Sequence, residues 1–267
     1  MSFAGATAMT ESEPGTWAGA IAPDWDIVGN ANGGYLLALA GRAMAGTADR
    51  HDVTSITGHF LRPGQEGPVT VSAELVKIGR RFTTVRATVA AAKPLISALG
   101  TFTDLSDSSN DQRTMTIGER PLFPHPDECQ RVEAGETFPP KFMSNVDLRL
   151  HPDDNFYHAP SGNLLMRGWL KLINDEPWDS IGLLLASDAF PPTIFNSAIG
   201  MAWVPTLELT VHVRKRPAPG WLQCHFSSRF VSEGFVEEDG LMWDATGTLV
   251  AQSRQLSLLP RPPEHSA

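Results

Sequence analysis

The sequence predicts an α+β fold in which one unit, a helix followed by antiparallel strands, occurs twice. Two glycines, Gly33 and Gly34, open an apolar run rich in Leu and Ala, which are strong helix formers. Strand-like segments separated by Gly and Pro turns follow this run. The same order of segments returns in the second half, and such a repeat constrains the whole fold.

The composition is that of an ordinary globular protein. The 267 residues are 42% hydrophobic and 19% charged. The formal net charge of -9, without a basic cluster, argues against nucleic acid or an anionic membrane as a partner. We find no apolar run of the roughly 18 residues that a membrane span needs.

The cysteine usage indicates a reducing compartment. Cys129 and Cys224 are the two cysteines, too few for a disulfide framework in a chain of this length. The first residues lack the basic and apolar regions of a secretory signal. We therefore expect a cytoplasmic protein with a flexible tail over residues 1–15.

The first helix is the centre of the first unit. Asn32 is expected to cap it, and Gly33 and Gly34 let another group approach the backbone closely. The run is apolar on nearly all sides, which is typical of a buried helix. The helix alone favours a core element with a glycine-rich entry turn over one whose amino end faces a site.

The rest of the first unit, residues 16–104, reads as strands. Alternation and enrichment in Val and Thr predict them. The expected strands are 16–21, 53–61, 69–78, 82–90 and 95–102, with a further extended piece at 25–28.

The second unit, residues 161–260, follows a proline-rich segment, 105–160, that we expect to be a linker. A strand is predicted over 164–173, then a largely apolar helix within 181–201 that Pro191-Pro192 interrupts early. The remaining expected strands are 206–214, 221–231, 235–243 and 249–258.

Turn residues of the two halves align at a constant offset. Pro63 and Pro217 are 154 residues apart, as are Leu95 and Leu249. At this offset Asp188 occupies the place that Gly34 holds in the first half. A chance match is improbable because turn chemistry agrees at several points.

Several motifs resemble the acyl-CoA thioesterase II family, whose fold is the double hotdog. In the first half they are Gly33–Leu36, Phe60–Gly64 and Gly79–Arg81. In the second half they are Ala186–Asp188, Thr206–His212 and Leu249–Gln255. The resemblance covers nearly the whole chain apart from residues 1–15 and 105–160.

The resemblance implies hydrolysis of acyl-CoA without a covalent serine. The family uses an aspartate at the start of the second helix, a threonine opening the next strand and a glutamine in the last strand. These fall on Asp188, Thr206 and Gln255. The family also implies no metal or organic cofactor, and a homo-oligomer. Two positions depart from its pattern, Glu208 in place of a common aspartate and an extra Lys215.

The chemistry of thioester hydrolysis assigns a role to each group. Asp188 is expected to activate water that Thr206 and Gln255 position. A carboxylate at a helix start should remain ionised there. The amides of Gly33 and Gly34 are expected to hold the thioester oxygen. We expect Tyr35 and His59 to line the substrate site as well, although His59 also fits a hydrogen-bonded sheet histidine.

Other interpretations stay open. Without the resemblance, Asp188 reads as a helix cap. A protein that binds acyl-thioesters without consuming them has the same features. A third possibility is a hotdog enoyl-CoA hydratase, suggested by the residues from Asp153 to His158, but their proline-rich context favours a loop. The chain has no Gly-x-Ser-x-Gly motif, and its histidines lack paired metal spacing.

Overall fold

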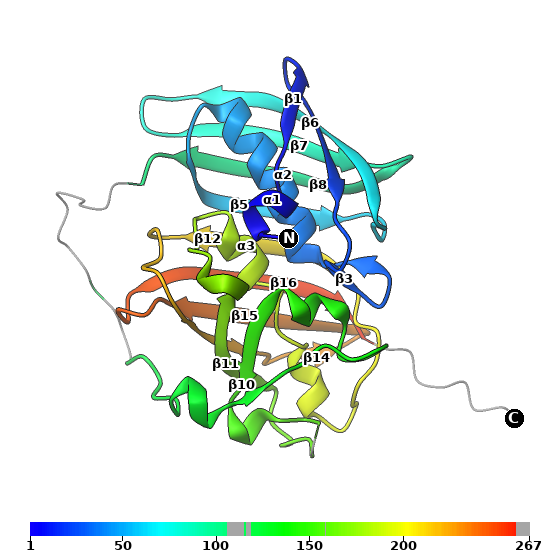
Figure 1. Ribbon diagram of the computed structural model, residues 1–267, viewed down its shortest axis with the longest axis vertical. Helices are drawn as coiled ribbons and strands as arrows, with labels where there is room; N and C mark the ends of the chain where they lie inside the picture. Colours follow the sequence, from blue (N-terminus) through cyan, green and yellow to red (C-terminus); the bar gives the residue numbers. More distant parts are fainter. Residues whose placement is uncertain (106–114, 116–118, 158, 260–267) are drawn as a thin grey trace, which may run out of the picture.

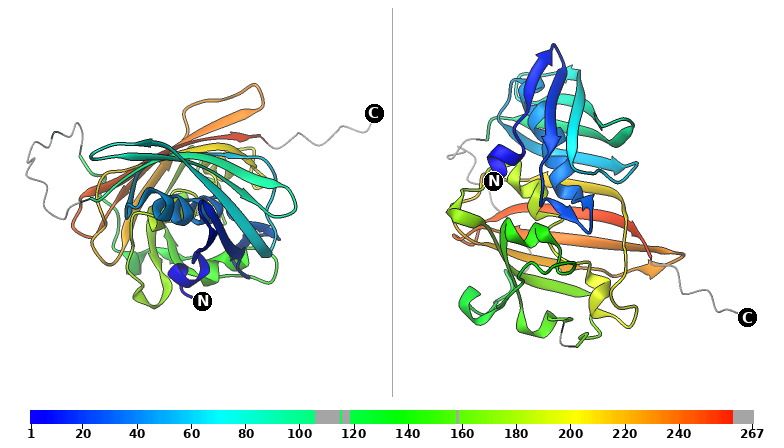
Figure 2. Two further views of the ribbon diagram at one scale, coloured as in Figure 1. Left: turned by 90° about the horizontal axis from the view of Figure 1, so that it is seen from above. Right: turned by 45° about the vertical axis from the view of Figure 1, so that its right-hand side comes forward.

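The computed structural model describes residues 1–105, 115, 119–157 and 159–259. Figures 1 and 2 show an N-terminal half stacked on a C-terminal half, each built from a curved sheet and one central helix.

Five strands wrap around α2 (Gly33–Ala48) in the N-terminal half, and a sixth, β1 (Thr10–Glu13), pairs with the outermost of them, β2. The strands, in sheet order, are β2 (Thr16–Ile21), β6 (Gly67–Ile78), β7 (Thr83–Ala90), β8 (Pro94–Thr103) and β5 (Asp52–Phe60). The short β3 (Asp26–Ile27) and β4 (Asn30–Ala31) form a hairpin just before α2. Each strand predicted in this half is therefore present, with ends within about two residues of the expected ones.

The C-terminal half repeats this plan with a much shorter helix, α3 (Gly182–Ala186). Its strands, in sheet order, are β12 (Thr206–Val213), β16 (Leu249–Leu258), β15 (Phe235–Trp243), β13 (Leu222–Ser227), β11 (Leu165–Leu172), β10 (Val146–Leu150) and β9 (Gln130–Arg131). The two-residue β14 (Val231–Ser232) pairs with β15.

The two halves share one sheet. Strand β5 pairs antiparallel with β12, so that residues 55–59 lie opposite residues 208–212. The hydroxyls of Thr57 and Thr210 are 2.8 Å apart across this seam. The result is a 14-stranded antiparallel sheet with the two helices on its inner side, which confirms the predicted double hotdog.

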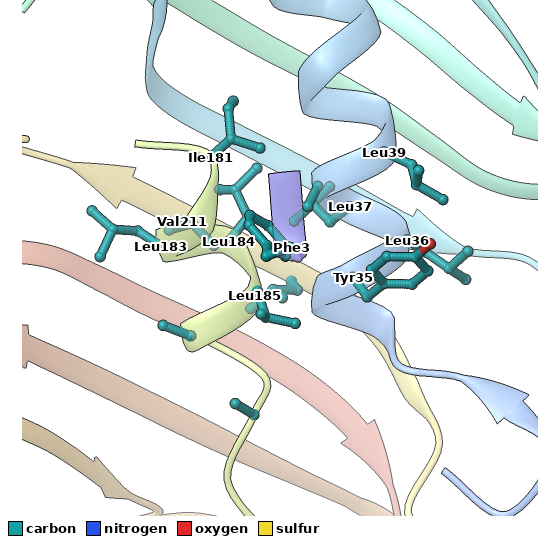
Figure 3. Close-up of a cluster of buried hydrophobic side chains, with 14 of the residues drawn as sticks. Phe3, Tyr35, Leu36, Leu37, Leu39, Ile181, Leu183, Leu184, Leu185 and Val211 are labelled. Carbon is teal, nitrogen blue, oxygen red and sulfur yellow. The ribbon is translucent and has the colours of Figure 1, made fainter. Parts of the chain in front are cut away.

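The helices cross at a glycine. A Cβ atom on Gly34 would lie 2.6 Å from the carbonyl oxygen of Leu184, so only glycine allows α2 to approach α3 this closely. Figure 3 shows the buried side chains that α1 (Phe3–Ala6), α2 and α3 contribute to one cluster. This packing brings the amino end of α2 to the segment that follows α3.

The first fifteen residues do not form the loose tail that we expected. Helix α1 and strand β1 (Thr10–Glu13) lie in this segment, and β1 pairs with β2. The ring of Phe3 is 3% exposed and contacts Trp25, and the amides of Phe3 and Ala4 donate to Glu176. One large buried side chain and one carboxylate acceptor hold a segment whose composition alone indicates disorder.

Two other expectations need correction. The helix expected within 181–201 ends at Ala186, five residues before Pro191-Pro192, and the chain beyond these prolines forms a 3-10 turn, η5 (Thr193–Asn196). The described part of the segment 105–160 contributes β9 and β10 to the C-terminal half of the shared sheet, together with the 3-10 turns η1 (Pro126–Glu128), η2 (Lys141–Ser144) and η3 (Pro152–Asp154). In the described residues, no helix has the length and apolar character to cross a bilayer.

Replacing Phe3 by Ala should lower the free energy of unfolding by about 3 kcal/mol, because it empties a filled core position. Chemical denaturation measures the change. Glu13→Ala is the control, since Glu13 is exposed and lies in the same segment of the chain. Equal stability of the two variants would show that the first residues are not docked.

Candidate active site

Asp188 binds the amino end of the helix from the other half. Its Oδ2 atom accepts a hydrogen bond of 2.8 Å from the Gly34 amide. We had expected Asp188 at the start of its own helix. Instead, it lies two residues beyond the last residue of α3. The favourable helix dipole is that of α2, whose first amides have no partner within the helix.

Asn32 holds the same carboxylate from a second direction. Its Oδ1 atom accepts from the Tyr35 amide at 2.9 Å, which confirms the predicted helix cap. Its Nδ2 atom donates to Asp188 Oδ2 at 3.1 Å and to the Asp188 carbonyl at 2.8 Å. The sequence revealed the cap but not the contact with Asp188, which crosses between the two halves.

Burial sets the protonation of Asp188. Loss of solvent raises the pKa of this carboxyl to about 6, although the amides of Gly34 and Gly33 and the Asn32 side chain act in the opposite direction. The carboxyl is thus mainly ionised at neutral pH, as predicted, but it takes up a proton more readily than an exposed aspartate.

The glycine amides are engaged by Asp188. Gly33 and Gly34 were expected to present free amides to a substrate oxygen, but the Gly34 amide donates to the carboxylate. A Cβ atom on Gly33 would lie 2.9 Å from Asp188 Oδ2 and 3.0 Å from the Phe60 ring. Both glycines therefore let a carboxylate, rather than a bound ligand, approach the backbone in this structure.

A cavity of about 740 Å³ opens beside this contact and is lined by both halves of the chain. Asp188, Gly33, Thr206 and Gln255 line it. Aromatic side chains form much of the remaining wall, namely Phe60, Phe138, Tyr157, Phe190, Phe195 and Trp203. An apolar cavity with a few polar groups at one place is typical of a small-molecule site.

Thr206 and Gln255 are linked through a serine that the sequence did not single out. The Ser257 hydroxyl lies 3.5 Å from Thr206 Oγ1, and Gln255 Nε2 lies 3.4 Å from the Ser257 hydroxyl. Ser257 lies opposite Thr206 where β16 pairs with β12. All three residues expected to be catalytic thus line one cavity, with long hydrogen bonds between two of them through Ser257.

Tyr35 and His59 do not line the cavity. Tyr35 is a core residue, stacked on Trp25 with ring centroids 5.1 Å apart, and its hydroxyl donates to the Ala6 carbonyl at 2.7 Å. His59 is exposed and lies opposite Glu208 on the outer side of the sheet. Since side chains alternate along a strand, the neighbouring Phe60 lines the cavity instead.

The two aspartates that suggested a hydratase do not line the cavity. Asp153 lies in the turn η3 with an exposed side chain, while Asp154 is buried and binds Arg167 through two hydrogen bonds of 2.6 and 2.9 Å. His158 lies outside the described residues. In the part of the chain that is described, no group of three or more His, Cys, Asp or Glu side chains is arranged to hold a metal ion.

Two family models match the sequence. The acyl-CoA thioesterase N-terminal domain matches residues 21–103, and the acyl-CoA thioesterase C-terminal domain matches residues 126–259. An uncharacterized protein of Mycobacterium tuberculosis is 33% identical over 82 residues, which cover 31% of this chain. The match spans 28% of the length of that relative.

Solved structures resemble the chain over nearly its full length. A protein from Thermobifida fusca described as a thioesterase II superposes with a TM-score of 0.86 at 29% identity, covering 97% of each chain. An acyl-CoA thioesterase II from Mycobacterium marinum superposes with a TM-score of 0.73 at 21% identity, covering 99% of this chain and 100% of its own. The second likeness concerns the fold alone.

Replacing Asn32 by Asp should raise the pKa of the Asp188 carboxyl above 6. The change removes a hydrogen-bond donor and adds a like charge, while the helix keeps a capping side chain. A ¹³C NMR titration of the carboxyl, assigned with Asp188→Asn, measures it. Asn30→Asp, which adds the same charge elsewhere on the cavity wall, is the control. An unchanged pKa in Asn32→Asp would contradict the contact.

Proposed function

Because this chain belongs to the acyl-CoA thioesterase family, we propose that it hydrolyses an acyl-CoA to the free acid and CoA, with Asp188 as the general base. One observation carries the proposal. Asp188, Thr206 and Gln255, far apart in sequence, line the same apolar cavity. The polar groups gather at the amino end of α2, and the apolar walls supply a surface for an acyl chain.

The reaction requires a water molecule in this polar corner. Thr206 and Gln255 hydrogen-bond the water, and Asp188 takes its proton as the oxygen attacks the thioester carbon. The tetrahedral intermediate then collapses, the carbon–sulfur bond breaks, and the proton held by Asp188 passes to the CoA sulfur. Water is thus divided between the acid and the thiol, and no covalent enzyme intermediate forms.

The amides of α2 stabilise the developing oxyanion only after Asp188 becomes neutral. In the resting site the Asp188 carboxylate accepts the hydrogen bond that the Gly34 amide donates. Once Asp188 takes the proton from water, it no longer competes as an anion for the amino end of the helix. The negative charge moves to the thioester oxygen, which the same amides can then bind. This exchange retains the role first expected for Gly33 and Gly34.

The runner-up is a protein that binds acyl-CoA without hydrolysing it. Such a protein would use the same apolar cavity and would be stabilised by acyl-CoA. The hydratase interpretation is weaker, because Asp153 is exposed in a turn and does not line the cavity. A homo-oligomer and a cytoplasmic location remain predictions from the resemblance and from the cysteine content.

Asp188→Asn should lower the rate of thiol release from acyl-CoA by about 10³-fold or more, because the variant cannot accept the proton of water. A panel of short to long and straight to aromatic acyl-CoAs, with a thiol reagent as readout, identifies the preferred acyl group. The variant should still bind acyl-CoA, seen as a raised melting temperature.

Asp153→Asn is the control for this experiment. It makes the same chemical change on an exposed aspartate, and it should keep wild-type thiol release. Full activity of Asp188→Asn would exclude Asp188 as the base. Binding without thiol release by the wild type would support the binding protein. Hydration of an enoyl-CoA that Asp153→Asn loses would support the hydratase.

The pH dependence of kcat/KM should show an acidic limb near pH 6. The base works only when ionised, and burial raises the pKa of Asp188 to about 6. On the acidic side, activity should therefore fall about tenfold for each pH unit below this pH. A limb near pH 4, the range of an exposed aspartate, would contradict the buried base.

A further inference from the structure

A second buried carboxyl lies behind the candidate site. Glu238 is in β15 and is 8% exposed. It lies directly opposite Gln255 where β15 pairs with β16, and Gln255 is also 8% exposed. Residues that lie opposite each other in an antiparallel pair point to the same face, so the two side chains are neighbours on the buried side of the sheet.

Glu238 also binds the end of a segment that forms one wall of the cavity. Its Oε2 atom accepts a hydrogen bond of 2.8 Å from the Thr193 amide. Thr193 comes five residues after Asp188, and the residues between them, 189–192, all line the cavity. The Thr193 hydroxyl lies 2.6 Å from that of Ser228, which fixes the same turn from another strand connection. Glu238 therefore contacts the turn after Asp188 and neighbours Gln255.

The charged groups that act on Glu238 are both acids. Burial, the charge of Asp188 and the charge of Glu237 raise the pKa of Glu238 to about 7, against the hydrogen bonds from Thr193. Two nearby carboxyls in one apolar site do not readily ionise together. The ionised state of Asp188 thus favours the neutral acid at Glu238.

A neutral carboxylic acid can supply the hydrogen-bond donor that the side-chain oxygen of Gln255 needs. This Oε1 atom is buried and has no hydrogen-bond partner among the described residues. A buried amide oxygen without a donor has lost its hydrogen bonds to water without replacing them, which is unfavourable. An ionised carboxylate has no proton to give, whereas a protonated one has an O–H donor. Glu238 is the titratable group directly opposite this oxygen in the strand pair.

We propose that Glu238 is a positioning residue that, as a neutral carboxylic acid, donates its proton in a hydrogen bond to Gln255 Oε1. The bond fixes the Gln255 amide with Nε2 on the side of Ser257 and Thr206. Its consequence for turnover rests on the proposed function, but the hydrogen bond itself does not. The active state then has Asp188 ionised and Glu238 protonated, which gives a bell-shaped pH dependence of kcat/KM.

Infrared spectroscopy tests the hydrogen bond without any substrate. As the pH rises from 5 to 9, the wild-type chain should lose the carboxylic-acid C=O band of Glu238. This band should be missing from Glu238→Gln at every pH and should be present in Asp188→Asn. The band should shift in Gln255→Leu, which removes the acceptor. Absence of a Glu238 band, or a band that Gln255→Leu leaves in place, overturns the proposal whatever the activity.

Kinetics of two matched variants test the positioning role. Glu238→Gln keeps a donor for Gln255 and an acceptor for Thr193 at every pH, whereas Glu238→Met keeps neither. Glu238→Met should lower kcat about tenfold to a hundredfold with little change in KM. Glu238→Gln should recover most of this loss and should lack the alkaline limb of the wild-type profile.

The outcomes separate this proposal from the proposed function. An alkaline limb unchanged in Glu238→Gln, or wild-type kcat in Glu238→Met, overturns the positioning role while thiol release still supports the thioesterase. If the wild type releases no thiol from any acyl-CoA, the thioesterase fails and the positioning role fails with it. The infrared result then decides the hydrogen bond alone.

Discussion

The structure depends on one contact between its halves, the Asp188 carboxylate at the amino end of α2. The contact has to be close, since the Gly34 amide and the Asn32 side chain both reach the same oxygen. It also leaves a carboxylate partly buried, where its pKa is raised to about 6. A group that is bound as an anion yet takes up a proton near neutral pH is suited to act as a base.

Two features of the fold bring Asp188 to this place. Pairing of β5 with β12 joins the half-sheets and fixes the halves side by side. Gly34 has no side chain, so α2 can approach the carbonyl of Leu184 closely. The same closeness supplies the amides that hold the carboxylate. Gly33 and Gly34 are therefore required both for the packing of the helices and for the contact with Asp188.

The sequence predicted the strands and the repeat because alternation and turn residues are local signals. It predicted too long a second helix, because an apolar run such as 181–190 does not reveal where a helix ends. Its resemblance to a family predicted that Asp188, Thr206 and Gln255 form one site, and these three residues line one cavity. Asn32, Ser257 and Glu238 acquire their contacts across strands or between halves, and no local pattern reports such contacts. Tyr35 and His59 failed for other reasons, since His59 lies on the outer face of its strand and the Tyr35 ring packs in the core against Trp25.

The two buried carboxyls place a limit on how the site can be charged. An apolar cavity can hold one negative charge at the amino end of α2, where the helix dipole and amides stabilise it. A second anion at Glu238 would have the Thr193 hydrogen bonds for stabilisation but would face the charges of Asp188 and Glu237. A neutral acid at Glu238 also supplies a donor to the buried oxygen of Gln255. The proton on Glu238 therefore stabilises the wall of the cavity and fixes the orientation of the Gln255 amide. Burial, together with the charge at Asp188, thus favours the protonated form of Glu238.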